Sequence, residues 1–378
     1  MDFSLGPAAE TFRAQARAWL AAHPGGAGGQ EWERTLGADG WIGLAWKGEY
    51  GNRHADLAQQ VAWGEEYARA GAPGRAGHIG ENLLAPTLEA HGSREQRDRF
   101  LPAIARGEEL WCQGYSEPGA GSDLAGIRTT AERDGDGGYR VTGQKIWTSL
   151  AHEADWCFVL ARTEPDSRRH HGLSLLLVPM RQPGRIEVRP IRQLTGTAEF
   201  NEVWFDGAHA DAGHIVGGAG NGWRVAMALL GYERGVSTLV QQIGFERELS
   251  GVVARAAASG ATGDPAVRDR IVRQWAELKT MRWNALRTLG TTDPAAPSVA
   301  KLLWGGWHQR LGELAVAVRG APATAGPADW AQEAPYELDE AQRLLLFSRA
   351  DTIYGGSDEI QRTIIAERVL GLPKEPRG

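Results

Sequence analysis

The sequence is poor in the residues that organise disulfide-rich and metal-dependent proteins. It holds only two cysteines, Cys112 and Cys157, in 378 residues, so neither a disulfide framework nor a cysteine-based zinc site can define the fold. The ten histidines show no HExxH motif and no paired ligand spacing. We therefore expect no metal site and a reducing, cytoplasmic environment.

Long hydrophobic runs and strong charge of one sign are also missing. No window of about 18 uncharged apolar residues occurs, and the N-terminus lacks the basic stretch and apolar core of a signal peptide. The 41 basic and 47 acidic side chains give a net charge of −6, without a basic tract. This balance is not that of a nucleic-acid binder. We expect a protein that binds neither nucleic acid nor a membrane.

What is present is a change of hydrophobic period along the chain. Helical spacing up to about residue 110 includes a start at Pro7 and a capping box from Ser93 to Gln96. Short strand-like runs fill residues 111–216, and helical spacing returns in residues 217–378. We predict an α+β multidomain fold: an N-terminal helical domain (1–110), a middle β-barrel or sandwich domain (111–216) and a C-terminal domain like a four-helix bundle (217–378).

Generic nucleotide and hydrolase motifs do not fit this sequence. The stretch from Gly138 to Lys145 misses the phosphate-loop spacing, because Gln144 separates Gly143 from the lysine. We interpret residues 142–144 as a hairpin turn between two short strands. No GxGxxG follows a first strand, and the sequence around Ser116 lacks the final glycine of a nucleophile elbow. A hydrolase that uses Ser116 is therefore a weak hypothesis.

One carboxylate has the surroundings that a general base requires. Glu233 shares a helical row with Leu229, Val236 and Val240. Burial on such a row raises the pKa of a carboxyl group towards the neutral range in which a base works. A buried structural ion pair, with Arg234 for example, explains the same pattern. The residues alone leave both interpretations open.

Three blocks of the sequence resemble the signatures of the acyl-CoA dehydrogenase family. They are Trp111–Asp123, Val141–Ser149 and Ile353–Arg362, the last followed by Ile365–Arg368. The blocks stand in the family's order, and the resemblance covers nearly the whole chain. It agrees with the order of helical, β and helical regions that was obtained from the periodicity.

The resemblance implies an FAD enzyme with the flavin between the β domain and the C-terminal helices. It places Ser122 near the pyrophosphate or the pantetheine arm of the substrate, and Arg234 in support of the substrate site. A flavin needs a flat apolar wall and hydrogen-bond donors to its ring. The residues implied to bind the cofactor are Gln113, Tyr115, Ser116, Gly121, Ser122, Trp147, Thr148, Ser149, Gly356, Ser357 and Glu359.

The resemblance also implies the reaction. In the family a glutamate removes the α proton of an acyl-CoA thioester, hydride passes from the β carbon to flavin N5, and a trans-2-enoyl thioester forms. Many members carry the base directly after the tyrosine of the C-terminal block, but here that position is Gly355. A branch similar to isovaleryl-CoA dehydrogenase carries it in an earlier Glu-Arg pair, which Glu233 and Arg234 match. We therefore predict Glu233 as the base.

A second departure concerns assembly. The family's Arg-x-x-Phe-Gly and Gln-x-x-Gly-Gly stretches, which help to hold the neighbouring subunit's FAD, are not evident. The chain is similar to bacterial members that form heteromers. We expect a homo- or hetero-oligomer, dimer or tetramer, with an electron-transfer flavoprotein as electron acceptor. The alternatives are a non-catalytic or half-site partner subunit, and a dehydrogenase or oxidase of carrier-protein-bound acyl groups.

Overall fold

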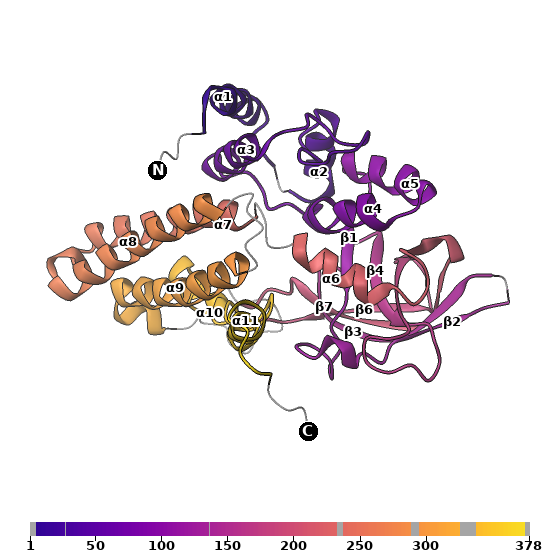
Figure 1. Cartoon of the computed structure of the whole chain (residues 1–378). Coiled ribbons are helices and arrows are strands. Elements are labelled where there is room, and N and C mark those ends of the chain that lie inside the picture. The colour runs from indigo at the N-terminus through magenta and orange to yellow at the C-terminus, as the bar shows by residue number, and fades with distance from the viewer. Residues whose placement is uncertain are drawn as a thin grey trace.

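The structure, a computed structural model, describes residues 5–26, 28–135, 137–232, 237–288, 295–325 and 338–374. Figure 1 shows helices of the first third of the chain above a β-sheet, with the C-terminal helices beside the sheet. The predicted order of helical, β and helical parts is confirmed. The domain limits at residues 110 and 216 stay a prediction.

The N-terminal part is helical, and one of its helices begins where the sequence predicts. Ser93 accepts a hydrogen bond from the backbone N–H of Gln96, whose side chain in turn accepts one from the backbone N–H of Ser93, so the capping box is confirmed. Stacked Trp41 and Trp63, with ring centroids 4.2 Å apart, lie in the core of this part. Its elements are α1 (Pro7–Ala22), α2 (Gly29–Ala38), α3 (Leu57–Arg69), η1 (Gly80–Leu84), α4 (Ala85–His91) and α5 (Arg94–Ala105).

The middle part is one mixed sheet in the order β6-β7-β3-β2-β4-β5-β8, with β1 paired to β4. A single residue pair, Thr130 with Arg162, links β2 to β4. The two halves on either side of this link pack their inner faces into a shared core, so the sheet is a sandwich and not a closed barrel. The strands are β1 (Trp111–Gly114), β2 (Thr130–Arg133), β3 (Tyr139–Ser149), β4 (Trp156–Arg162), β5 (Leu173–Pro179), β6 (Ile186–Ile191), β7 (Phe200–Ala210) and β8 (Ile215–Val216).

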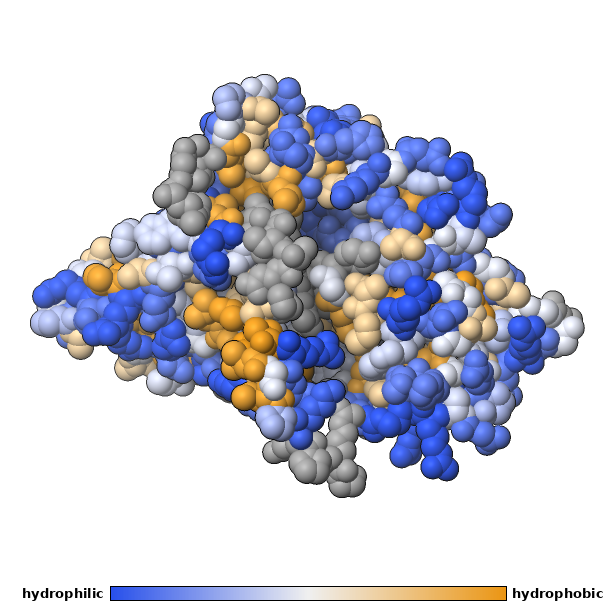
Figure 2. Space-filling view, in the orientation of Figure 1, coloured by the Kyte–Doolittle hydropathy of each residue, from blue (hydrophilic) through white to orange (hydrophobic). Residues whose placement is uncertain are grey.

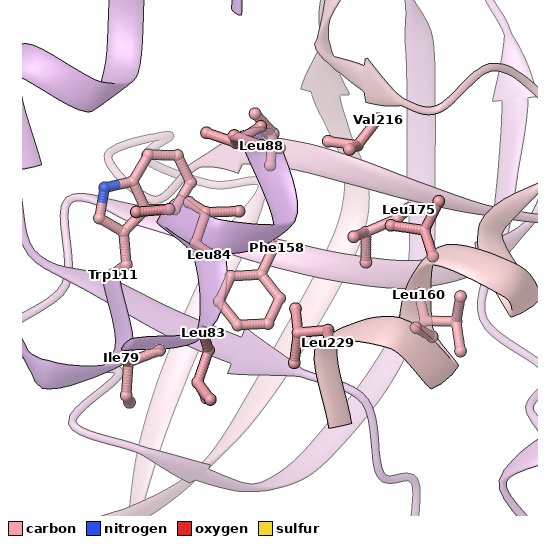
Figure 3. Packing of buried hydrophobic residues seen from close by; sticks show 14 of the residues in the cluster. Ile79, Leu83, Leu84, Leu88, Trp111, Phe158, Leu160, Leu175, Val216 and Leu229 are labelled. Carbon is pink, nitrogen blue, oxygen red and sulfur yellow. The ribbon is translucent and has the colours of Figure 1, made fainter. Parts of the chain in front are cut away.

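Strands β4 and β5 are buried on both faces, which explains their continuous apolar runs. Cys157 and Val159 point into the core of the sandwich, whereas Phe158 and Leu160 point towards the helices. Figure 3 shows this second core, where leucines of η1 and α4 meet Phe158, Leu160, Leu175 and, from α6, Leu229. The alternation of side chains along one strand thus joins the N-terminal helices and α6 to the sheet.

The predicted hairpin at residues 142–144 is wrong. Residues Tyr139–Ser149 form one strand, β3, and its register with β7 shifts between Val141 and Gly143. Gly143 has a φ of +150°, and a Cβ atom there would lie 2.5 Å from Oγ1 of Thr129. The glycine therefore marks a bulge where backbone passes close to Thr129, and not a reversal of the chain.

The C-terminal part is helical, and polar side chains cap the first turn of two of its helices. Helix α8 begins at Pro265 after Asp264, and Ser357 caps α11 by accepting the backbone N–H of Ile360. Within the described ranges, no helix has the length and apolar character needed to cross a membrane. The helices are α6 (Gly222–Tyr232), α7 (Ser237–Ala258), α8 (Pro265–Thr288), α9 (Ala296–Arg319), α10 (Glu340–Ser348) and α11 (Asp358–Ile364), which continues as the π-helical turn η6 (Ile365–Val369).

Candidate functional site

The first signature block begins in β1 and continues as a loop over the edge of the sheet. Gln113 lies on β1 in register with Phe158 of β4. The ring of Tyr115 is buried and meets the Phe158 ring edge-on, with centroids 5.9 Å apart. The carbonyl oxygen of Ser116 accepts a hydrogen bond of 2.9 Å from the backbone N–H of Ile146 on β3. The loop therefore runs beside the second block.

A buried ion pair joins the two blocks. The side chain of Lys145 on β3 is fully buried, and its Nζ atom lies 2.9 Å from Oε1 of Glu117. Nζ also donates to the carbonyl oxygens of Tyr115, at 3.1 Å, and Leu160, at 2.8 Å. Glu117 and Tyr115 belong to the loop of the first block and Leu160 to β4, whereas Lys145 itself lies on β3. The ammonium thus fixes the positions of three segments relative to one another.

The partners of Glu117 keep its carboxylate charged in this buried place. Burial alone would raise the pKa of Glu117, but the Lys145 ammonium and the backbone N–H groups of Arg128 and Thr129 lower it below its ordinary value. Burial lowers the pKa of Lys145, against the opposing effect of Glu117. Lys145 is buried against these groups and cannot reach a bound phosphate. This agrees with the conclusion from the sequence that residues 138–145 are not a phosphate loop.

Trp147 has strained backbone and an exposed side chain. Its φ is +60°, in the left-handed region that a bulky side chain rarely adopts, and it lies where the register between β3 and β7 shifts. The indole is 56% exposed, and it contacts the ring of Phe200 edge-on. A large apolar ring held out of the core by a costly backbone is typical of a binding surface.

The neighbour of Trp147 has an unused polar atom. Thr148 is fully buried, and its Oγ1 has no hydrogen-bond partner among the described residues. Its carbonyl oxygen accepts the side-chain amide of Asn201 at 3.0 Å, which holds the end of β3 in place next to Ser149. A buried hydroxyl without a protein partner requires an explanation, and a bound ligand is one. Trp147 and Thr148 together fit a flat, heteroatom-bearing ring such as a flavin.

The glycine-rich end of the first block leaves its backbone accessible. Gly121 and Ser122 are exposed, and a Cβ atom at Gly119 or Gly121 would meet no atom within 4 Å. Open backbone of this kind is compatible with a phosphate-bearing cofactor. The assignment of Gly121 and Ser122 to that role stays a prediction.

The third block lies on the C-terminal helices. Gly356 has a φ of +86°, and Nε2 of Gln361 donates to the carbonyl oxygens of Gly355 and Gly356, both at 3.2 Å. Ser357 caps α11, and the side chain of Glu359 is 80% exposed in the first turn. Glu233 and Arg234, the predicted base and its neighbour, lie outside the described residues. Their roles stay predictions.

Sequence reasoning missed the ion pair that organises the site. Lys145 and Glu117 both lie within the recognised blocks, but opposite charges far apart in a sequence do not show that they meet. The available signal was Lys145 itself, a charged residue inside a strand-like run.

Comparisons with known proteins show the family of the chain. Residues 8–108, 112–208 and 220–370 match the acyl-CoA dehydrogenase N-terminal, middle and C-terminal domains, respectively. The acyl-CoA dehydrogenase IpdE1 of Mycobacterium tuberculosis (strain ATCC 25618 / H37Rv) is 54% identical over 390 residues, which cover 98% of this chain and 99% of the relative.

Solved structures of the same fold were also found. The Tcur3481-Tcur3483 steroid ACAD has a TM-score of 0.85 at 29% identity and covers 99% of this chain and 100% of its own. The ChsE4-ChsE5 complex from Mycobacterium tuberculosis has a TM-score of 0.82 at 29% identity, with the same coverage. The chain therefore belongs to the acyl-CoA dehydrogenase family of FAD-dependent flavoproteins.

Proposed function

We propose that this chain catalyses the α,β-dehydrogenation of an acyl-CoA thioester to the trans-2-enoyl thioester, with Glu233 as the base that removes the α proton. Arg234 and Ser122 support the substrate, and an electron-transfer flavoprotein accepts the electrons. The observation that carries the proposal is the end of β3 after Lys145. There a strained, exposed Trp147 precedes Thr148, whose buried hydroxyl has no partner among the described residues.

The residues at this end of β3 have separate tasks in the proposed mechanism. The Trp147 indole covers one face of the ring, and the Thr148 hydroxyl gives a hydrogen bond to a ring heteroatom. Bound FAD supplies a hydride acceptor for the β carbon. The α proton of a thioester is too weakly acidic to leave without a base and a polarised carbonyl group. Glu233 accepts and holds that proton. The leucine and valine residues that share its helical row in the sequence make the surroundings less polar, which favours a carboxyl group that acts as a base.

Anaerobic bleaching of the flavin tests this proposal. The enzyme, purified with any subunit that accompanies it, is mixed with straight-chain, branched-chain and polycyclic acyl-CoAs while the flavin absorbance is recorded. A polycyclic substrate belongs in the panel because a similar structure is described as a steroid ACAD. We expect one class to bleach the flavin, and Glu233→Gln to prevent bleaching while FAD stays bound.

The matched control is Glu340→Gln, which removes an 86% exposed carboxylate at the start of α10. We expect this variant to bleach as the wild type does. Bleaching that survives Glu233→Gln would remove Glu233 from the mechanism and leave the dehydrogenase itself.

A second candidate function is that of one subunit of a heteromeric acyl-CoA dehydrogenase. Two similar structures, Tcur3481-Tcur3483 and ChsE4-ChsE5, each pair two differently named chains. Helix α8 exposes three apolar side chains at helical spacing, Val272, Trp275 and Trp283, which are 61%, 55% and 53% exposed. Figure 2 shows apolar residues gathered over the C-terminal helices. Val299 and Leu303 of α9 are also exposed. An exposed apolar surface of this kind suits a subunit interface.

The ratio of FAD to chain distinguishes the two assemblies. The chain is purified alone and with an acyl-CoA dehydrogenase subunit of the same genome, and both mass and flavin content are measured. A homomer is expected to be yellow alone, with one FAD per chain. A heteromer is expected to be colourless alone and to bind FAD when the second subunit is added. Trp275→Arg should weaken either assembly.

A further inference from the structure

A buried charged cluster within the C-terminal helices has no role in the mechanism above. The imidazole of His308 on α9 lies between two carboxylates: Nδ1 is 2.5 Å from Oδ2 of Asp351, and Nε2 is 2.9 Å from Oε2 of Glu248 on α7. The side chains of His308 and Asp351 are 5% and 1% exposed. A histidine with one carboxylate on each ring nitrogen must donate from both, which requires the imidazolium form.

The surroundings favour that charge. Burial lowers the pKa of His308, but the hydrogen bonds and charges of Asp351 and Glu248 outweigh it and raise the pKa to about 9. Among the described residues, these two carboxylates are the charged groups that act on the imidazole, and the ring of Phe245 lies 4.5 Å from it, centroid to centroid. His308 is therefore charged at neutral pH, and its charge holds Asp351 in one position.

Asp351 in turn holds the segment that leads to the third signature block. Its Oδ1 accepts a hydrogen bond of 2.7 Å from the hydroxyl of Tyr354. Its carbonyl oxygen accepts the ammonium of Lys301 on α9, and that ammonium also lies 4.7 Å from the centre of the Tyr354 ring. Both the side chain and the backbone of Asp351 are thus tied to α9.

The segment after Tyr354 needs an external anchor. Gly355 and Gly356 have φ values of +63° and +86°, and consecutive glycines lose more conformational entropy on ordering than any other pair. A Cβ atom at Gly355 would meet nothing closer than 3.9 Å, so packing does not confine this residue. The polar contacts on either side, from Asp351 before the glycines and from Gln361 after them, confine it instead.

We propose that His308 is a positioning residue: held between Glu248 and Asp351, it fixes Asp351 and thereby the Tyr354–Ser357 segment against α9. The proposal rests on the proposed function, which assigns Gly356, Ser357 and Glu359 to the cofactor site. His308 touches neither substrate nor cofactor in this account. It acts through Asp351 on the order of the segment, and through the segment on the affinity for FAD.

Hydrogen exchange of the FAD-loaded enzyme tests the positioning directly. We compare wild type, His308→Gln, which keeps a hydrogen-bonding side chain without the charge, and Arg310→Gln. Arg310 lies on α9, as His308 does, and its replacement removes an exposed ion pair with Glu277 of α8. Several amides of the segment are hydrogen-bonded, including those of Tyr354 and Asp358. We expect His308→Gln to speed exchange at residues 352–361 on the order of tenfold, which corresponds to about 1.4 kcal/mol, and Arg310→Gln to leave it unchanged.

A purely structural ion pair gives a different pattern. Equal acceleration over α7, α8 and α9 would overturn the proposal, and so would unchanged exchange at residues 352–361. If His308→Gln does not fold, the wild type serves alone. Above pH 9 its imidazolium loses the proton, and exchange at residues 352–361, corrected for the intrinsic pH effect, should rise more than exchange of α8. If exchange at residues 352–361 and exchange of α8 rise equally with pH, the proposal is contradicted.

The dissociation constant of FAD separates this inference from the proposed function. If the segment loosens in His308→Gln and the dissociation constant rises with it, both stand. If the segment loosens and FAD affinity is unchanged, His308 positions the segment, and the assignment of Gly356, Ser357 and Glu359 to the cofactor fails.

Discussion

The ammonium of Lys145 lies 2.9 Å from the carboxylate of Glu117, 28 residues earlier in the sequence, and both groups are buried. The contact joins the loop of the first signature block to the strand of the second. Two segments that resemble flavin-binding motifs therefore lie side by side, held together by this ion pair and its backbone hydrogen bonds.

Removing one charge of this pair should be costly. Lys145→Met leaves the Glu117 carboxylate buried without its ammonium, which costs about 3–5 kcal/mol in comparable buried pairs. We expect chemical denaturation to show a loss of this size, and the double variant with Glu117→Gln to be less damaged than the single one. Arg189→Gln, which breaks an exposed pair with Glu187, should change stability by less than about 0.5 kcal/mol. Equal losses of stability in Lys145→Met and Arg189→Gln would argue against the role of the buried pair.

The bulge at Gly143 should reject any side chain. Gly143→Ala places a Cβ atom 2.5 Å from Oγ1 and 2.8 Å from Cα of Thr129, at a φ of +150°. We expect a loss of about 2 kcal/mol or more, since backbone and packing are both strained. Gly121→Ala, where the Cβ atom meets open space, is the control for the loss of glycine itself. Similar denaturation midpoints for the two variants would contradict the bulge.

The N-terminal helices should lose stability in acid through Glu66. Its carboxylate bonds to Arg13, Arg17 and Arg69, and although burial acts to raise the pKa, these hydrogen bonds lower it to about 2. Because the folded pKa lies below the ordinary 4.5, the stabilisation is complete above that value and is lost as the pH falls towards 2. Thermal melts of wild type and Glu66→Gln should differ at pH 7 and converge towards pH 2. A difference that does not change with pH would exclude this titration.

Sequence reasoning found the plan of the fold because local signals determine it. The change from helical to strand spacing at Trp111, the capping box at Ser93 and the cap at Ser357 all act over a few residues. The failure at Gly143 has a physical reason: a glycine between two short strand-like runs suits a turn and a bulge equally, and only the approach of Thr129 decides. The contacts of Lys145 with Glu117 and of His308 with Asp351 depend on tertiary packing, which a local sequence pattern does not predict.

The exposed indole of Trp147 should matter for binding and little for folding. In Trp147→Gly the left-handed backbone becomes free of strain, which offsets the lost contact with Phe200 to within about 1 kcal/mol. We expect the apoprotein to melt near the wild-type temperature and its affinity for FAD to fall at least about tenfold, as for the loss of one aromatic stacking contact. Trp204→Ala, at a 39% exposed indole on β7, should leave FAD affinity unchanged. If both variants bind FAD as the wild type does, Trp147 is not part of the flavin site.

The most direct test of the flavin site is Thr148→Val, compared with Thr87→Val by FAD titration and by melting of the apoprotein. Both threonines are fully buried, but the Thr87 hydroxyl bonds to the carbonyl oxygen of Leu83 at 2.7 Å, whereas that of Thr148 has no partner among the described residues. Removing the partnerless hydroxyl should stabilise the apoprotein by about 1 kcal/mol and weaken FAD binding; removing the bonded one should destabilise it and leave FAD affinity unchanged. Unaltered FAD affinity in Thr148→Val would contradict the account, whatever the affinity of Thr87→Val.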